Sequence, residues 1–125
     1  MSIAICPGSF DPITLGHLNI IRRTSRIFDE VIVLVMVNSN KSTPMFSIEE
    51  RLSMVERAVE RYPNVTVNHV DGLLAEYAKK LPNAVLVKGL RAASDFDYEF
   101  QMNLINKKIN PELETMFLTA DQKYT

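Results

Sequence analysis

The sequence has little cysteine and no tryptophan, and neither sign of charge predominates. A single cysteine, Cys6, among 125 residues excludes a disulfide bond within the chain, and its place at the end of an apolar run predicts a buried, inert thiol. Fourteen basic residues stand against fifteen acidic ones. This balance argues against a broad nucleic-acid surface, which would carry a basic excess, but it is compatible with a local cationic pocket.

Long apolar runs are also missing. No run approaches the roughly 20 residues of a membrane span. The opening "MSIAIC" has neither the charged start nor the apolar stretch of a signal peptide. We therefore expect a cytoplasmic protein that binds neither membrane nor nucleic acid. With 46% apolar residues, the chain can form one domain with a real core.

Strand-like and helix-like patterns alternate along the chain. The apolar run "VIVLVMV" suits a strand that is buried on both faces, as in a parallel sheet. Strands are predicted at 2–6, 31–37, 65–70, 84–87 and 114–119. Four helices are predicted. The first covers 16–28, the second begins at 48 and ends before Pro63, the third follows Asp71, and the fourth covers 95–108. This order predicts an α/β fold: a Rossmann-like, doubly wound, parallel five-stranded sheet with helices on both faces.

Local signals refine the helices. Ser47 and Glu50 form an S-x-x-E capping box, and Asp71 is predicted to cap the short helix that follows it. The first helix is expected to carry Ile27 and Phe28 on its apolar side. The apolar side of the last helix is expected to contain Phe96, Phe100, Leu104 and Ile105.

A ligand site is expected at one edge of such a sheet. In doubly wound sheets, ligands bind beyond the carboxyl ends of the strands. The segments predicted to lie there are 7–17, 38–46, 70–74, 88–95 and whatever follows 119.

The stretch "PGSFDPITLGH" joins the first strand to the first helix. Gly8 allows backbone to approach a ligand closely, and His17 lies at a helix N-terminus, which attracts phosphate. Asp11 is predicted to shape the loop by accepting local backbone hydrogen bonds. Two interpretations of His17 remain open: it donates a ring N–H to a phosphate, or it only caps its own helix.

Two lysines follow strands. Lys88 interrupts an apolar strand at its carboxyl end, and Gly89 and Arg91 accompany it, which favours anion binding. Lys41 lies in the polar loop after the second strand. For both lysines, the alternative is a solvated surface side chain.

Four motifs together resemble a known family. "TLGH" at 14–17, preceded by "GSFDP", resembles the T/H-x-G-H signature of the nucleotidyltransferase superfamily. With "PMFSIEER", "KGLRAASDFDYE" and "PELETMFL" following in order, the chain is similar to the bacterial phosphopantetheine adenylyltransferases. The resemblance covers essentially the whole chain.

The resemblance implies a reaction and its partners. ATP and 4′-phosphopantetheine give dephospho-coenzyme A and pyrophosphate, a step of coenzyme A synthesis. Coenzyme A is a further implied ligand, magnesium would enter with ATP, and a homohexamer is implied. The attacking phosphate is already anionic, so no general base is needed, and positioning with fixed positive charge can supply the catalysis.

Roles carry over from the family by position. The implied catalytic residues are His17, Lys41, Lys88 and Arg91. The implied ATP-binding residues are Ser9, Phe10, His17, Gly89, Leu90, Arg91, Glu99, Tyr124 and Thr125. The implied residues for 4′-phosphopantetheine are Ser9, Lys41, Leu74 and Lys88. Core packing is an equal alternative for Leu74, a solvated helix position is the alternative for Glu99, and no residue is predicted as a metal ligand.

Two features depart from the family pattern. Lys88 stands where the family usually has arginine, so the charge is kept but the bidentate fork is lost. The chain as given ends "DQKYT", whereas the family continues with a serine-rich ATP loop and a helical tail. We therefore expect a single nucleotidyltransferase domain over 1–125 without those parts, either because the sequence is incomplete or because it is a short form.

Two other functions remain possible. One is a sister nucleotidyltransferase whose acceptor is nicotinamide mononucleotide or a polyol phosphate. The other is a nucleotide- or coenzyme-binding module without turnover.

Overall fold

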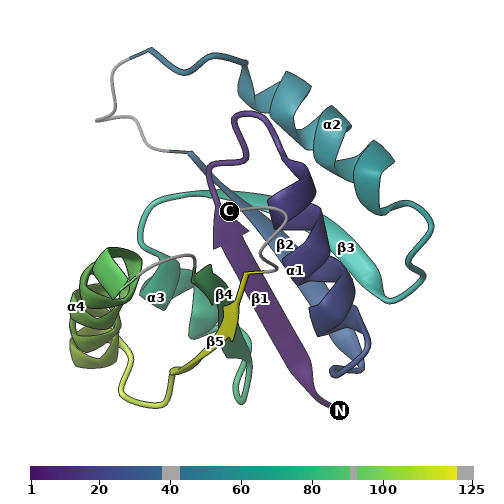
Figure 1. Cartoon of the computed structure of the whole chain (residues 1–125). Coiled ribbons are helices and arrows are strands. Elements are labelled where there is room, and N and C mark those ends of the chain that lie inside the picture. The colour runs from purple at the N-terminus through teal and green to yellow at the C-terminus, as the bar shows by residue number, and fades with distance from the viewer. Residues whose placement is uncertain (38–42, 91–92, 121–125) are drawn as a thin grey trace.

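The computed structural model describes residues 1–37, 43–90 and 93–120, and its strands form one sheet (Figure 1). The strands are β1 (Ile3–Gly8), β2 (Glu30–Val37), β3 (Val65–Asp71), β4 (Val85–Leu90) and β5 (Glu114–Thr119). The helices are α1 (Leu15–Ser25), α2 (Ile48–Val59), α3 (Leu74–Ala78) and α4 (Ala93–Ile109). All four strand pairings are parallel, in the order β3-β2-β1-β4-β5, which confirms the predicted fold class.

Apolar side chains from the sheet divide between two cores. Ala4 and Cys6 of β1 belong to one core with Ile21 of α1 and Val55 of α2. Ile5, between them in sequence, belongs to the other core. Because alternate residues of a strand point to opposite faces, α1 and α2 cover one face of the sheet and α3 and α4 contribute to the other.

The direction of winding reverses at β1. The chain first adds β2 and β3 on one side of β1, and then adds β4 and β5 on the other side. The helices that follow β1 and β4 therefore lie on opposite faces, which leaves a crevice at the carboxyl ends of these strands. This topological switch point is where the sheet can accept a ligand.

Several predicted helix ends were wrong. The capping box of Ser47 and Glu50 is confirmed. Asp71, however, is the last residue of β3, and Leu73 precedes α3 as its N-cap without any side-chain hydrogen bond. α1 ends at Ser25, where the N–H of Arg26 donates to two carbonyls of the last turn, so Ile27 lies beyond the helix and is 59% exposed.

The buried side of α4 differs from the predicted one. Phe96, Phe100, Leu104 and Ile105 are 43–49% exposed. The less exposed positions are Glu99, Met102, Asn103, Asn106, Lys107 and Ile109. Their spacing is helical, but four of the six are polar, so a search for apolar periodicity does not find this stripe. The polar members suggest that α4 borders a site as well as a core.

None of the described helices has the length and apolar character that a membrane span requires.

Candidate active site

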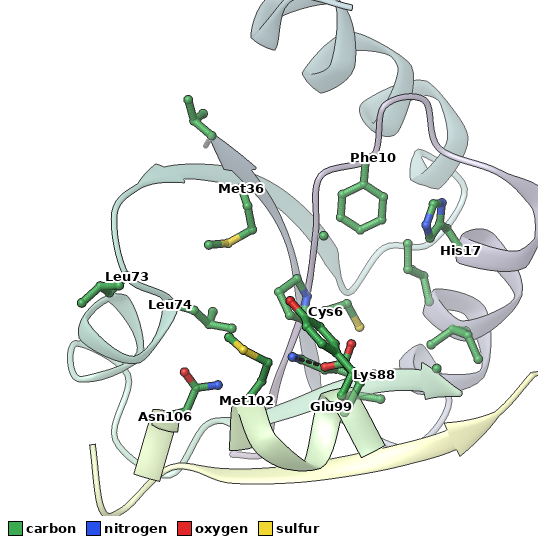
Figure 2. Close-up of a pocket in the computed structure, with 18 of the residues that line it drawn as sticks. Cys6, Phe10, His17, Met36, Leu73, Leu74, Lys88, Glu99, Met102 and Asn106 are labelled. Atoms are coloured by element: carbon green, nitrogen blue, oxygen red, sulfur yellow. Dashed lines mark hydrogen bonds and ion pairs between the residues drawn. The ribbon is translucent and has the colours of Figure 1, made fainter. Parts of the chain in front are cut away.

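A cavity of about 890 Å³ lies at the switch point, beyond the carboxyl ends of β1 and β4 (Figure 2). Its walls come from the ends of β1, β2, β3 and β4, from the starts of α1 and α3, and from α4. The lining residues come from four of the five segments in which the sequence predicts a site, namely 7–17, 70–74, 88–95 and the stretch after 119, and also from α4. The fold therefore gathers stretches that are up to about a hundred residues apart into one pocket.

The pocket has a polar end and an apolar end. The polar side chains of the pocket are His17, which lies with Phe10 near the loop that follows β1, and the paired Lys88 and Glu99. The apolar wall contains Met36, Leu73, Leu74 and Met102. Ile109 also lines the pocket. Asn106, which is almost fully buried, adds an amide to this wall. A ligand with an anionic group and a long, amide-bearing arm would match both ends.

His17 is held by the residue that begins its helix. The backbone N–H of Thr14 donates to Nδ1 of His17 at 3.0 Å, and the Thr14 hydroxyl accepts from the His17 backbone N–H at 3.3 Å. Since Nδ1 accepts a hydrogen bond, a neutral ring carries its proton on Nε2. His17 therefore caps its own helix with one nitrogen and has its other nitrogen as a hydrogen-bond donor.

Lys88 and Glu99 form an ion pair inside the pocket. Lys88 Nζ lies 2.6 Å from Glu99 Oε1, and the two side chains are only 17% and 23% exposed (Figure 2). Neither residue is a solvated surface position, so those alternatives from the sequence are wrong. The structure brings two predicted site residues together from β4 and α4, and the glutamate partly neutralises the lysine.

Two glycines are explained by close packing. A Cβ on Gly8 would lie 3.1 Å from Cε2 of Phe10, whose ring also meets the His17 ring edge-on at a centroid distance of 5.0 Å. A Cβ on Gly89 would lie 2.8 Å from Cγ1 of Ile20 in α1. Gly89 is therefore required by the packing of α1 on β4, whatever ligand it contacts.

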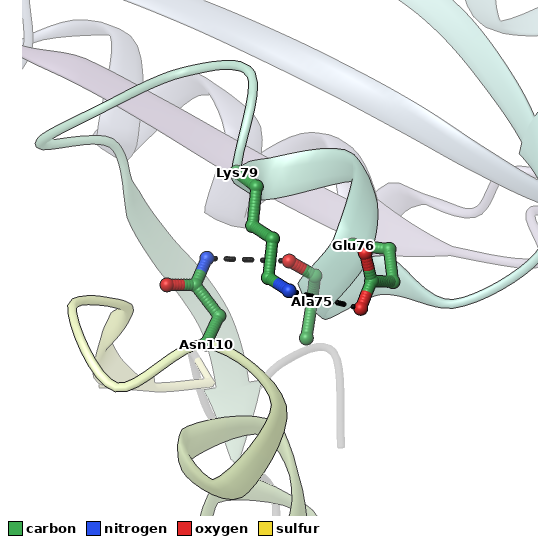
Figure 3. Close-up of polar contacts among 4 residues, drawn as sticks. All are labelled: Ala75, Glu76, Lys79 and Asn110. Atoms are coloured by element: carbon green, nitrogen blue, oxygen red, sulfur yellow. Dashed lines mark hydrogen bonds and ion pairs between the residues drawn. The ribbon is translucent and has the colours of Figure 1, made fainter.

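Leu74 both lines the pocket and packs against the core, so the two interpretations of this residue are compatible. Its helix, α3, has only five residues. The buried Asn110 side chain donates to the carbonyl of Ala75 at 3.2 Å and ties α3 to the end of α4 (Figure 3). Glu76 and Lys79 pair at 3.1 Å on the exposed side of α3. The Asn110 contact therefore helps to hold the helix that carries Leu74.

Cys6 lines the pocket but is chemically quiet. Burial raises the pKa of its thiol to about 12, against the smaller opposing effect of a hydrogen bond with Thr24. A neutral, buried thiol is a poor nucleophile and metal ligand. Among the described residues, no three His, Cys, Asp or Glu side chains are grouped so that they could hold a metal ion.

Comparison with known proteins decides the family. Residues 5–125 match the cytidylyltransferase-like family. A phosphopantetheine adenylyltransferase of Dictyoglomus turgidum is 55% identical over 122 residues, which are 98% of this chain and 76% of that protein. Another from Clostridium tetani is 52% identical over 125 residues, which are 100% of this chain and 78% of that protein. The chain belongs to the phosphopantetheine adenylyltransferases.

Solved structures with lower identity share the fold of this adenylyltransferase. A bifunctional NMN adenylyltransferase/ADP ribose pyrophosphatase from Francisella tularensis superposes with a TM-score of 0.69 at 16% identity, over 99% of this chain and 38% of that one. A lipopolysaccharide core biosynthesis protein from Thermoplasma volcanium gives 0.67 at 19% identity, over 97% and 98%. At this identity the likeness concerns the fold alone.

Other predicted residues of the adenylyltransferase either do not line the pocket or lie outside the described part of the chain. Ser9 is exposed and is not among the lining residues, although its neighbours Gly8 and Phe10 are. Leu90 ends β4 and likewise does not line the cavity. Lys41, Arg91, Tyr124 and Thr125 lie outside the described residues.

Sequence reasoning missed several lining residues, among them Met36, Met102 and Asn106. For Asn106 a signal existed. Residues 99, 102, 106 and 109 share one side of a helix, and two of them are polar. A helix side that mixes apolar and amide groups is typical of a ligand wall rather than of a core.

Proposed function

We propose that this chain transfers the adenylyl group of ATP to 4′-phosphopantetheine in the pocket between β1 and β4, giving dephospho-coenzyme A and pyrophosphate. The observation that carries the proposal is the pairing of a polar end at the α1 N-terminus with an apolar wall in one cavity. The phosphate of the acceptor would lie near His17, and the pantetheine arm along Leu74, Met102 and Asn106. Coenzyme A shares this arm and would compete for the same wall.

The reaction needs one displacement at phosphorus. An oxygen of the acceptor phosphate forms a bond to the α-phosphorus of ATP, and the bond from that phosphorus to the bridging oxygen of the β-phosphate breaks. Pyrophosphate leaves with the electron pair. Because the nucleophile is already an anion, no side chain has to remove a proton, and the protein has to hold two anions in line.

His17 is proposed to stabilise the charge that develops on the α-phosphate. The Thr14 N–H holds its ring with Nε2–H as the donor, so the donor is oriented before the reaction begins. Preorganised donors of this kind are effective because they need no rearrangement in the transition state. Positive charge from Lys41, Lys88 and Arg91 would offset the charge of the two substrates.

The ion pair of Lys88 has a consequence for binding. A substrate phosphate has to share or displace the Glu99 carboxylate, which lies 2.6 Å from Lys88 Nζ. The ammonium group of lysine is a compact charge on a flexible side chain, so it can exchange one anionic partner for another. Arginine would instead favour a bidentate contact. We propose that Lys88 meets the phosphate of the acceptor and that Glu99 moves to its role at ATP.

The remaining contacts to ATP are proposed from the family pattern. They come from Ser9, Phe10, Gly89, Leu90, Tyr124 and Thr125. Magnesium is proposed to enter with ATP, and the reaction is proposed to take place in the cytoplasm, where ATP is made available.

A homohexamer is also proposed. Apolar side chains on α4 support this, because Phe96, Phe100 and Leu104 are 43–46% exposed, and Phe96 meets Phe117 of β5 edge-on. Light scattering that gives only the monomer mass would contradict the proposed assembly.

Pyrophosphate release with different acceptors tests the proposed function. We expect release with ATP and 4′-phosphopantetheine, and none above background with nicotinamide mononucleotide or glycerol 3-phosphate. Release with either of the latter acceptors alone would identify a sister nucleotidyltransferase. Tight binding of ATP and 4′-phosphopantetheine without release would identify a binding module.

A further inference from the structure

The loop after β1 contains a strained residue that is anchored on both sides. Phe10 is buried and its backbone has a φ of +48°, in the left-handed region that residues other than glycine seldom adopt. On one side, the carbonyl of Ser9 accepts a hydrogen bond from Arg51 Nη1 at 3.0 Å. On the other side, the Asp11 carboxylate accepts the backbone N–H groups of Met45 and Phe46, each at 2.8 Å. Strained backbone persists only where its surroundings fix it.

Both anchors lead to the start of the same helix. Arg51 lies in the first turn of α2, and Met45 and Phe46 lie just before that helix. Asp11 therefore accepts backbone hydrogen bonds, as the sequence suggests, but from residues 34 and 35 positions further along the chain rather than from its own loop. The two contacts run in opposite directions, with Arg51 donating toward the loop and Asp11 accepting from α2's entry.

Arg51 is unusual among the charged residues of α2 because its side chain is buried. It is 6% exposed, and its Nη1 also contacts the Met36 carbonyl at 3.4 Å. Among the described residues, no carboxylate pairs with it, and its buried Nε has no hydrogen-bond partner. Buried charges are normally paired, because removing a charge from water is costly. The other charged side chains of α2, Glu49, Glu50, Glu56 and Arg57, are exposed.

We infer that Asp11 and Arg51, here called the clasp, are positioning residues for the adenylyl transfer. Arg51 holds the Ser9–Phe10 backbone at the polar end of the pocket, and Asp11 fixes where the chain returns to α2 after the stretch containing Lys41. The inference rests on the proposed function, because it concerns the loop that would contact both substrates.

The charge of Arg51 has a second effect. Lys88, the described lysine that lines the pocket, is already paired with Glu99, so its positive charge is largely offset before substrate binds. Among the residues that the structure describes, the guanidinium of Arg51 is compensated by the carbonyl dipoles of Ser9 and Met36 and by no carboxylate. It therefore leaves net positive charge behind the loop, in a setting with little water, where charge acts strongly on a bound anion.

Replacing Arg51 tests the clasp. We expect Arg51→Met to raise the Kd for ATP about tenfold and to lower kcat about tenfold, a combined loss of about a hundredfold in kcat/KM. Arg51→Lys, which keeps the charge and one donor, should recover activity to within about tenfold of the parent. The matched control is Arg57→Met, the same change at an exposed position of α2, which should stay within about twofold.

The Kd separates positioning from simple loss of fold. An unfolded fraction lowers the number of ATP sites found by calorimetry, but the remaining folded molecules bind with the parental Kd. A Kd and a kcat per binding site that match the parent in Arg51→Met would overturn the inference. If that variant does not fold, Asp11→Asn serves instead, because the amide keeps one of two acceptors and should cost about tenfold in kcat/KM.

The two members of the clasp should also depend on one another. If Asp11→Ala and Arg51→Met each cost about a hundredfold and act independently, the double variant should lose about ten-thousandfold. Because both hold one loop, we expect the double variant to lose far less than this product, and its loss beyond that of Asp11→Ala reports the separate charge effect of Arg51. If the loss of the double variant equals the product of the two single losses, the shared role of Asp11 and Arg51 is overturned. An inactive parent would instead refute the proposed function, so the two failures can be told apart.

Discussion

His17 shows how one side chain can combine a structural and a chemical task. Its Nδ1 accepts from the backbone of Thr14 and completes the cap of α1, and this contact fixes the tautomer. The two interpretations that the sequence leaves open are therefore not exclusive. The cap orients the ring, and the orientation is what a donor to a phosphate requires.

Replacement of His17 by alanine is expected to lower kcat about 10²–10³-fold, because one preorganised donor to the transition state is lost. The Kd for 4′-phosphopantetheine should change much less. Steady-state kinetics and calorimetry measure the two quantities. His69→Ala is the matched control, since His69 is exposed at β3 and does not line the pocket. A His17→Ala enzyme with parental kcat would mean that the histidine is only a cap.

The buried thiol of Cys6 should make the stability of the folded state depend on pH. Its pKa is raised by burial from 9.0 to about 12, so the folded state keeps the thiol proton in a range where the unfolded state releases it. The stabilisation is complete below pH 9 and is lost as the pH rises toward 12. Urea unfolding should therefore show the parent losing stability relative to Cys6→Ala by up to about 1.4 kcal/mol per pH unit in that range. Parallel curves for both proteins would contradict the assignment.

At the scale of elements, the strands could be predicted more fully than the helices. The run "VIVLVMV" is apolar on both faces because β2 lies inside the sheet, so periodicity identifies it directly. α4 could not be oriented in this way. Its inward side carries Glu99 and Asn106, which serve the pocket, whereas its outward side carries Phe96 and Phe100.

The candidate site could be predicted as a place but only partly as a set of contacts. Motif resemblance and the carboxyl-end rule lead to His17, Lys88 and Glu99, all of which line the cavity. The ion pair between Lys88 and Glu99 depends on how α4 packs against β4, and no spacing in the sequence states it. Arg51 is similar, because its partners are carbonyls of distant residues.

The close packing of α1 on β4 should make the free energy of unfolding sensitive to a larger side chain at position 89. In Gly89→Ala, the new Cβ would lie 2.8 Å from Ile20 Cγ1, and such overpacking should lower the free energy of unfolding by about 1–3 kcal/mol. Urea denaturation measures this change.

A second substitution serves as its control. Ile20→Ala alone should cost about 2–5 kcal/mol, because it leaves a cavity in the core. It also removes the atoms that the added methyl group of Gly89→Ala would meet. We therefore expect the double variant to be more stable than the sum of the two losses implies. If the losses in the free energy of unfolding are additive, the contact with Ile20 does not limit the size of the side chain at position 89.

At the scale of the whole molecule, the order of the strands explains why a pocket exists at all. The reversal at β1 sends the helices after β1 and β4 to opposite faces, and the crevice at the ends of these strands receives side chains from both faces of the sheet. The bifunctional enzyme from Francisella tularensis shares this fold with a TM-score of 0.69 at only 16% identity. The fold thus supplies the place, and the residues in it determine the acceptor.

Product analysis with ATP labelled at the α-phosphorus tests the central claim most directly. The chain is incubated with this ATP, magnesium and 4′-phosphopantetheine, and the products are separated and weighed by mass spectrometry. We expect the label in dephospho-coenzyme A, with an equal amount of unlabelled pyrophosphate and no label on the protein. Labelled AMP beside unchanged 4′-phosphopantetheine, or label attached to the chain, would contradict a direct transfer between the two bound substrates.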